Sequence, residues 1–338
     1  MQRYNRQILF PNIGREGQEK LLKSRVLLIG CGALGSLHAE MLARAGVGHL
    51  RIVDRDFVDF SNLQRQTLFT ESDAENRVPK AAAAAERLAE FNSEITIEPI
   101  IADVNPSNIE SLLDKCDLIM DGTDNFQARY LINDASIKHG IPWIYGAAVS
   151  SYGTAMTIIP GKTPCLQCVF EEMPDAGTAP TCDTAGVIMP IIAAVSAVQT
   201  AEAIKILVGD FEALHDSLVQ IDMWQNDWRR IGLGVPNPDC KACSLRSFEF
   251  LDVETREFSA VLCGRNSVQI APPKAASVDL PALADRLGNI SSVKLNQYLV
   301  RFDFENHEIT VFSDGRAIIG GTDDISVARS IYARYIGT

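Results

Sequence analysis

The stretch Val26-Leu27-Leu28-Ile29-Gly30-Cys31-Gly32-Ala33-Leu34-Gly35 decides the fold of this chain of 338 residues. Its four apolar residues predict a buried strand, and the glycine loop leads into an amphipathic run that ends at Gly46. Such a loop sets backbone N–H groups and a helix N-terminus against a phosphate, because small residues let the backbone approach. Asp54 ends the next apolar run about 20 residues further on, where a carboxylate can bind ribose hydroxyls. The alternative is an ordinary strand–turn–helix unit with glycines for packing, but strand, helix and acid together favour a nucleotide site.

Short β-like and helix-like runs alternate through the first half of the chain. The strand-like runs are rich in Val, Ile and Leu and cover 25–29, 50–54, 95–101, 118–121 and 143–145. The helix-like runs between them cover 34–45, 80–91, 106–114 and 125–139. This alternation predicts an α/β fold with a Rossmann-like, mainly parallel sheet that is covered on both faces.

The character of the sequence changes after residue 150. The runs 152–160, 217–223 and 229–233 predict antiparallel strands that extend the sheet, and 187–208 predicts a helix with Pro190 in its first turn. Residues 171–180 are rich in Pro, Gly, Asp and Ala, which predicts a mobile crossover loop. The last stretch has strand-like runs at 260–270 and 298–304 and helix-like runs at 279–288 and 323–335. We therefore expect a first domain at 1–245 and a small α+β domain at 246–338.

The composition, with 46% hydrophobic and 22% charged residues, is that of a globular protein. The formal net charge of −12 argues against sequence-independent binding to nucleic acid, which needs a basic footprint. The apolar run 186–198 is shorter than the roughly 20 residues that span a bilayer, so it predicts a buried helix. Residues 1–10 carry no apolar signal core. We expect a cytoplasmic protein without membrane contact, whose eight cysteines are not disulfides.

Three charged residues narrow the choice of nucleotide. Arg65 lies in the polar turn Ser61-Asn62-Leu63-Gln64-Arg65-Gln66, and Lys80 opens a helix-like run directly after Pro79. Arg offers a planar fork and Lys a point charge, and two cations suit a triphosphate better than a redox dinucleotide. Asp124 follows a strand, at the sheet edge where ligands of such folds bind, and its carboxylate can hold Mg²⁺ on the leaving phosphates. Taken singly, each charge is better explained as a solvated surface group, or for Asp124 as a helix N-cap, and it is their expected shared position around one crevice that favours a nucleotide site.

Two Cys-x-x-Cys pairs, Cys165/Cys168 and Cys240/Cys243, stand far apart in the chain. Four thiolates fill every position of tetrahedral Zn²⁺, which makes such a site structural. Redox pairs and unrelated core thiols are the alternatives, but both pairs follow Pro-containing loops and lack a thioredoxin-like setting. The pattern favours one zinc site.

Cys182 is a cysteine of a different kind, because it follows the predicted mobile loop and precedes a long helix. A thiol near a helix N-terminus can have a lowered pKa and act as a nucleophile. An inert loop cysteine is the competing interpretation. Cys31, Cys116 and Cys263 are interpreted as small core residues.

Together these motifs resemble the MoeB/ThiF family of adenylyltransferases, which are similar to the ubiquitin-activating enzymes. The resemblance covers residues 1 to about 245 and is closest to the longer ThiF-like form. Its motifs are Arg3-Tyr4-Asn5-Arg6-Gln7, the glycine loop, Ser61-Asn62-Leu63-Gln64-Arg65, Pro79-Lys80, Thr123-Asp124-Asn125, the cysteine pairs and Cys182-Asp183-Thr184-Ala185-Gly186. Ala33 stands where some members have Gly, a change that leaves the backbone contact intact.

The resemblance implies a reaction. A ubiquitin-like sulfur carrier, ThiS-like, inserts its diglycine tail, and its terminal carboxylate attacks the α-phosphate of ATP to give an acyl adenylate and pyrophosphate. The expected thiocarboxylate then serves thiamine-thiazole synthesis. A MoaD-like carrier for molybdopterin synthesis is the alternative.

The resemblance also assigns site residues. Arg65 and Lys80 match phosphate ligands, Asp124 the Mg²⁺ ligand and Asp54 the ribose ligand. The remaining matches are residues that contact the nucleotide, namely Gly30, Gly32, Ala33, Gly35, Ser61, Asn62 and Asn125. Arg6 matches an arginine that reaches ATP from the partner subunit, which implies a homodimer. Cys182 matches the cysteine that links to the activated carrier in ThiF-like members, with a persulfide donor as a further expected partner.

Two other classes of function share part of this pattern. An NAD-dependent oxidoreductase would share the glycine loop and Asp54 but leaves Arg65, Lys80 and the cysteine pairs unexplained. A non-catalytic scaffold would be expected to lack Arg65, Lys80 or Asp124. The last domain either docks the carrier or a sulfur donor or is a stabilising appendage, and Cys263 lacks the spacing of a rhodanese loop.

Overall fold

The computed structural model describes residues 1–173, 182–252, 258–262, 266–272, 278–288 and 291–336. The predicted mobile loop therefore lies largely outside the described residues, as do the side chain of Cys182 and the whole of Cys263. The chain divides into two units, Met1–Val253 and Glu254–Thr338, and each is considered by itself. The expected boundary at 245/246 and the roles of the two domains stay predictions.

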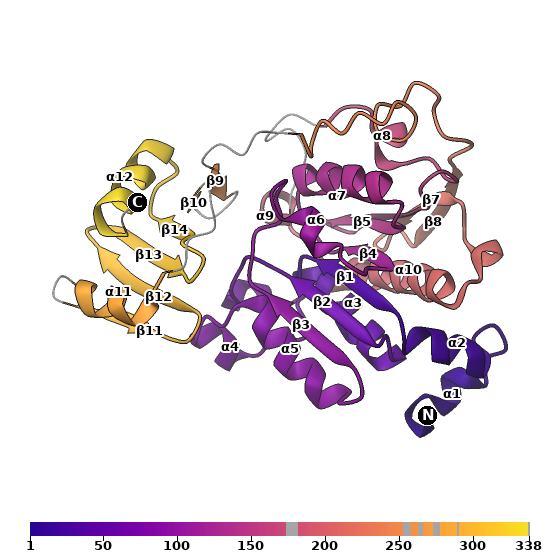
Figure 1. Cartoon of the computed structure of the whole chain (residues 1–338), viewed down its shortest axis with the longest axis horizontal. Coiled ribbons are helices and arrows are strands. Elements are labelled where there is room, and N and C mark those ends of the chain that lie inside the picture. Colours follow the sequence, from indigo (N-terminus) through magenta and orange to yellow (C-terminus); the bar gives the residue numbers. More distant parts are fainter. Residues whose placement is uncertain (174–181, 253–257, 263–265, 273–277, 289–290, 337–338) are drawn as a thin grey trace. The chain divides into compact units, whose positions relative to one another are not determined.

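An eight-stranded sheet forms the centre of the first unit (Figure 1). Its order is β3-β2-β1-β4-β5-β6-β7-β8; the first five strands are parallel and the last three antiparallel. The bounds are β1 Arg25–Ile29, β2 His49–Val53, β3 Thr96–Ile100, β4 Leu118–Asp121, β5 Trp143–Val149, β6 Tyr152–Ile158, β7 Ser217–Asp222 and β8 Asp227–Gly232. From β1 the chain adds β2 and β3 on one side and then β4 and β5 on the other, so the strand order reverses between β1 and β4. Ligands of such folds bind in the crevice at that point. The predicted Rossmann-like sheet with an antiparallel extension is confirmed.

Helices cover both faces of this sheet because alternate residues of each strand point to opposite sides. Val26 and Leu28 belong to a core shared with helices α2 (Gly14–Leu21), α3 (Ala33–Ala45), α5 (Lys80–Phe91) and α10 (Met189–Val208). Leu27 and Ile29 belong to the core of the other face, with α6 (Ile109–Leu112), α7 (Phe126–His139) and α8 (Leu166–Val169). The short helices α1 (Asn5–Ile8), α4 (Glu71–Glu75) and α9 (Cys182–Ala185) connect these parts.

Helix α10 is long and apolar enough to cross a membrane by length and composition alone. In the structure 61% of its most apolar window is buried, as in the core helix of a globular protein. The predicted buried helix is confirmed, and Gly209 ends it in the left-handed conformation that glycine adopts without strain.

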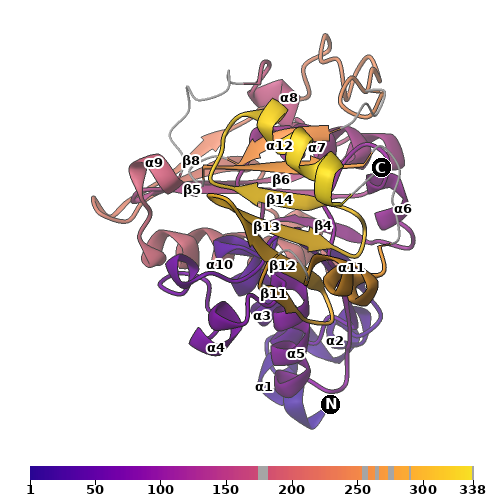
Figure 2. The same cartoon turned by 90° about the vertical axis from the view of Figure 1, so that its left-hand side faces the viewer.

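The second unit is a six-stranded antiparallel sheet of order β11-β12-β13-β14-β10-β9 with two helices. Its elements are β9 Phe258–Leu262, β10 Ser267–Ala271, α11 Leu280–Leu287, β11 Val293–Leu295, β12 Leu299–Phe304, β13 His307–Phe312, β14 Ala317–Gly320 and α12 Ile325–Tyr335. Figure 2 shows α11 and α12 crossing one face of this sheet, and both share its apolar core. The predicted α+β class is confirmed.

Three sequence-based element predictions differ from the structure. The run 260–270 is not one strand but parts of β9 and β10, which pair antiparallel after a turn that contains Asn266 at φ 43°. The predicted helix 106–114 shrinks to α6, because Asn105 and Asn108 hold the preceding residues in side-chain-capped turns. Strands β11, β13 and β14 were missed, although β13 pairs with its sequence neighbours β12 and β14 through short connections.

Candidate functional site

Three glycines bring the loops after β1 and β4 into direct contact at the reversal point of the sheet. A Cβ atom at Gly30, whose φ is +85°, would lie 2.6 Å from the carbonyl oxygen of Gly122. A Cβ at Gly35 would collide with the carbonyl oxygen of Gly30. Gly32 is the N-cap of α3, and no side chain caps that helix. The first N–H groups of α3 therefore face the crevice, as a phosphate site requires.

Asp54 fixes the glycine loop to the end of β2. Its Oδ2 accepts a hydrogen bond from the N–H of Cys31 at 2.6 Å, and its Oδ1 accepts from the N–H of Asp56 at 2.7 Å. Burial raises the pKa of Asp54, and the positive charge of Lys80 opposes that rise. Each carboxylate oxygen can accept a second hydrogen bond, so the expected contact with a ribose remains compatible with this arrangement.

Lys80 is buried at the start of α5, with its side chain only 5% exposed. Its Nζ lies 3.2 Å from Oδ2 of Asp56, and its N–H donates to the carbonyl oxygen of Asp56 at 2.9 Å. Sequence reasoning missed Asp56, although it stands two positions after Asp54. A buried ammonium needs such a partner to stay charged, so Asp56 stabilises the charge that a phosphate would meet.

The turn with Ser61 and Asn62 is held together by its own side chains. The Oδ1 atom of Asn62 accepts from the N–H of Asp59 at 3.1 Å, and the hydroxyl of Ser61 donates to Asp59 at 2.7 Å. Arg65 donates to the carbonyl oxygen of Ser61 at 2.8 Å. The structure therefore places Ser61 and Asn62 as residues that shape the turn and present Arg65.

Gln66 is a second residue that sequence reasoning did not single out. Its side chain is buried, and its Nε2 is the nearest atom to the space that a Cβ at Gly32 would fill, at 3.8 Å. Its Oε1 has no hydrogen-bond partner among the residues that the structure describes. An unpaired buried acceptor beside the helix N-terminus is suited to a ligand that carries a donor.

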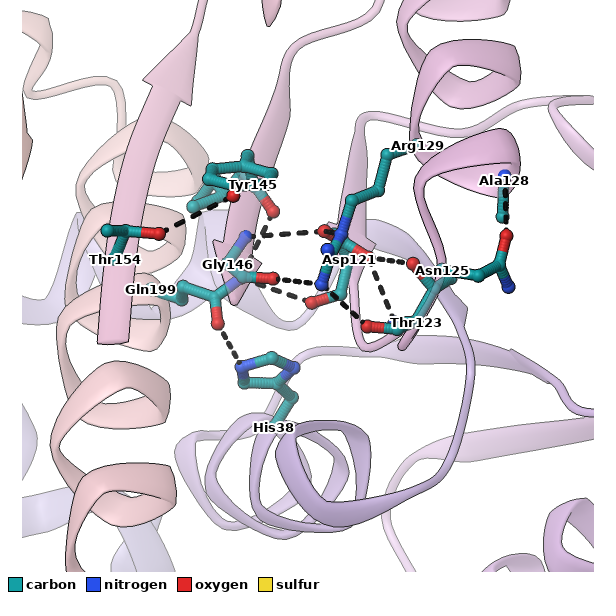
Figure 3. A network of polar contacts seen from close by, with 11 residues as sticks. His38, Asp121, Thr123, Asn125, Ala128, Arg129, Tyr145, Gly146, Thr154 and Gln199 are labelled. Atoms are coloured by element: carbon teal, nitrogen blue, oxygen red, sulfur yellow. Dashed lines mark hydrogen bonds and ion pairs between the residues drawn. The ribbon is translucent and has the colours of Figure 1, made fainter. Parts of the chain in front are cut away.

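A buried ion pair shapes the loop that carries Asp124 (Figure 3). Arg129 Nε lies 3.0 Å from Oδ2 of Asp121, and its Nη2 donates to the carbonyl oxygens of Thr123 and Gly146 at 2.8 and 2.9 Å. The N–H and hydroxyl of Thr123 donate to the other oxygen of Asp121, at 2.9 and 2.7 Å. The loop is thus rigidly tied to β4 and β5, although neither member of the pair was predicted.

Asp124 itself is exposed at this edge and forms no hydrogen bond with another described residue. The N-cap of α7 is Asn125, whose Oδ1 accepts from the N–H of Ala128 at 2.8 Å. The alternative interpretation of Asp124 as the helix N-cap is therefore wrong, because Asn125 fills that role. An exposed carboxylate at this edge fits a hard cation such as Mg²⁺, although its charge also interacts with Arg55 and Arg129.

The four paired cysteines meet on the α7 side of the sheet. Their sulfur atoms lie within 4.8 Å of one another, with Cys165 Sγ 3.5 Å from Cys240 Sγ and Cys168 Sγ 3.4 Å from Cys243 Sγ. Tetrahedral zinc with Zn–S bonds of about 2.3 Å needs sulfur atoms about 3.8 Å apart. Donor set and spacing fit Zn²⁺, and a filled thiolate shell makes the site structural.

Arg6 does not reach the crevice of its own chain. It lies exposed on α1, where Gln7 donates to the carbonyl oxygen of Ala45 and Tyr4 packs against Gly46, both at the C-terminal end of α3. Helix α3 has 13 residues and is therefore about 20 Å long. That length separates Arg6 from the glycine loop at the opposite end of α3.

Cys182 is the first residue of α9. The segment directly after α9 is anchored near the crevice. The N–H of Ser150 donates to the carbonyl oxygen of Gly186 at 2.7 Å, and Gln64 donates to that of Val187 at 3.5 Å. The backbone of α9 thus approaches the turn that carries Arg65.

Comparisons with known proteins show the family of this chain. A family model described as the ThiF family matches residues 4–242. The sulfur carrier protein ThiS adenylyltransferase of Bacillus subtilis is 44% identical over 337 residues, which cover 99% of each chain. The sulfur carrier protein adenylyltransferase of Thermus thermophilus is 35% identical over 248 residues, 72% of this chain and 90% of that protein. The crystal structure of Escherichia coli MccB with ATP has a TM-score of 0.63 at 22% identity, covers 71% of this chain and 74% of that one, and indicates a shared fold alone.

Proposed function

The chain belongs to the ThiF family, and from that premise we propose that it adenylylates the C-terminal glycine carboxylate of a ThiS-like sulfur carrier with ATP. The observation that carries the proposal is the likeness to a ThiS adenylyltransferase over nearly the whole chain. A match limited to the first unit would not distinguish one carrier from another. The match to the ThiS adenylyltransferase extends over both units. The predicted family is confirmed, and a MoaD-like carrier is not favoured.

The chemistry requires an in-line displacement. A carboxylate oxygen of the carrier forms a bond to the α-phosphorus, the bond from that phosphorus to the bridging oxygen breaks, and pyrophosphate leaves with the electron pair. We assign the phosphates to Lys80, Arg65 and the N–H groups at the start of α3, and the ribose to Asp54. Asp124 would hold Mg²⁺, which when bound offsets negative charge on the leaving phosphates.

The position of Arg6 supports a homodimer. Because Arg6 lies about the length of α3 from its own glycine loop, it can serve a nucleotide only in another subunit. We therefore propose that Arg6 of each protomer reaches the crevice of its partner. We assign adenylylation to the first unit and place the protein in the cytoplasm. The second unit either docks the carrier or a sulfur donor or is a stabilising appendage.

Carrier-dependent ATP–pyrophosphate exchange tests the proposed function. We expect exchange only when a ThiS-like carrier with a free diglycine terminus is present, and none with a carrier that lacks the last glycine. Faster exchange with a MoaD-like carrier would reassign the pathway. Reduction of NAD by the protein without any carrier would support the oxidoreductase alternative instead.

Cys182→Ser separates adenylylation from sulfur transfer. Exchange needs only ATP, the cationic residues and the carrier carboxylate, so its rate should remain within about twofold of wild type. A serine hydroxyl ionises far less than a thiol near neutral pH, so thiocarboxylate formation with a persulfide donor should fall about tenfold or more. The yield is measured by the mass of the carrier. An unchanged yield would mean that Cys182 is not a nucleophile and would favour the MoeB-like mechanism.

A further inference from the structure

A buried glutamine adds hydrogen bonds at the end of the short ladder between β4 and β5. The ladder between these strands contains only the pairs Ile119↔Trp143 and Met120↔Ile144. Where this ladder ends, Nε2 of Gln199 donates to the carbonyl oxygens of Asp121, which follows the last pair, and of Ile144, which belongs to it, each at 3.1 Å. Gln199 comes from α10 and is fully buried. One side-chain amide therefore joins the two strands at the point where their short ladder ends.

His38 sets the orientation of that amide. Both protons of the Gln199 amide go to backbone carbonyls, so its Oε1 must accept from Nε2 of His38, which lies 2.9 Å away. His38 is consequently the neutral tautomer with its proton on Nε2, and burial lowers the pKa of His38 to about 4. Its Nδ1 has no partner among the described residues, so the role of the ring in this network is to donate a hydrogen bond to Gln199.

The network connects α3 with the ends of β4 and β5 (Figure 3). His38 stands on α3, whose N-terminus faces the glycine loop, while Gln199 holds the residue that ends β4. The side chain of that residue, Asp121, binds Thr123 directly before Asp124. Gly146 on β5 leaves room for the amide, since a Cβ there would collide with Gln199. A shift of Gln199 would thus move the loop of Asp124 relative to the phosphate side.

We propose that Gln199, oriented by His38, is a positioning residue for adenylylation that fixes where Asp124 stands relative to the glycine loop. The inference rests on the proposed function and adds a residue to it. Gln199 lies under the loop, so it should affect the alignment of the reacting groups more than the binding of ATP. Small displacements of reacting groups are known to lower rates by up to about a hundredfold.

The test compares Gln199→Met with Thr200→Val in carrier-dependent exchange. Thr200 is the neighbouring buried residue on α10, and its hydroxyl has no partner among the described residues, so this variant controls for disturbance of the helix. For Gln199→Met we expect kcat to fall about ten- to a hundredfold with the KM for ATP nearly unchanged, and more Mg²⁺ to be needed for half-maximal rate. Thr200→Val should match wild type in all three quantities.

Four outcomes decide the inference. A folded Gln199→Met protein with the kcat and Mg²⁺ dependence of Thr200→Val would overturn it. If Gln199→Met does not fold, His38→Leu provides the second test, because it removes only the donor that orients the amide. That variant should show the same pattern in weaker form, and wild-type kinetics would overturn the inference. Absence of exchange in the wild type would instead defeat the proposed function, and the inference with it.

Discussion

Asp124→Ala should lower carrier-dependent ATP–pyrophosphate exchange by about a thousandfold, the effect expected when a group that stabilises developing charge is removed. A factor of that size corresponds to about 4 kcal/mol of transition-state free energy. The carboxylate is exposed at the carboxyl edge of β4 and makes no hydrogen bond with another described residue, so its loss should leave the fold unaffected. Exchange of radiolabelled pyrophosphate into ATP, measured over a range of Mg²⁺ concentrations, gives the rate.

Asp114→Asn is the matched control for this experiment. Asp114 is also an exposed carboxylate of the first unit, but it precedes β4 and lies at the opposite edge of the sheet. The control should exchange pyrophosphate at the wild-type rate. A near wild-type rate for Asp124→Ala would remove Asp124 from the mechanism, while equal losses in both variants would indicate a general electrostatic effect.

Cys240→Ser should remove both zinc and a large part of the stability of the first unit. A structural zinc site of four thiolates contributes binding free energy directly to folding, on the order of 10 kcal/mol in small zinc domains. Loss of even a third of that would lower the melting temperature by about 10 °C in a unit of this size. Metal analysis of the purified protein should give one Zn²⁺ per wild-type chain and much less in the variant.

Cys116→Ser provides the comparison for the zinc experiment. Cys116 is half-buried outside the cluster, burial raises its pKa to about 11, and its Sγ donates to the carbonyl oxygen of Leu118 at 3.0 Å. A serine hydroxyl can make the same hydrogen bond, so this variant should keep its zinc and its melting temperature. A wild-type protein that is fully stable without zinc would defeat the assignment of the cysteine cluster.

The expected site residues that depend on short stretches of chain could be named from the sequence. The glycine loop, Asp54, Lys80 and the turn with Arg65 each combine a local backbone conformation with a residue type, and the structure joins Asp54 to Cys31 of the loop and Lys80 to Asp56. Gly30 illustrates the reason, since its positive φ and its contact with Gly122 follow from the absence of a side chain. The zinc site could be predicted in the same way, because two Cys-x-x-Cys pairs supply the four thiolates that such a site needs.

The groups that support these residues were not predictable. Arg129, Asp56 and Gln199 look like ordinary helix or loop residues in the sequence, and each acquires its role from a partner on another element. The alternative of Asp124 as a helix N-cap could not be decided from residue type either, because Asp and Asn are both good capping residues and Asn125 stands next to it. The backbone settled it by placing the amide of Asn125 over the N–H of Ala128.

The sequence by itself determined the strand–loop–helix unit, the parallel sheet and the thiolate set, because periodicity, glycine and cysteine act over a few neighbouring residues. Only the tertiary structure decided which carboxylates are already engaged, which amide joins β4 to β5 and which end of α3 lies near Arg6. The physical reason is that a buried polar group must find a partner wherever the fold supplies one. The partner of Asp121 is Arg129, eight residues away in the chain, whereas the partner of Gln199 is His38, which is 161 residues away.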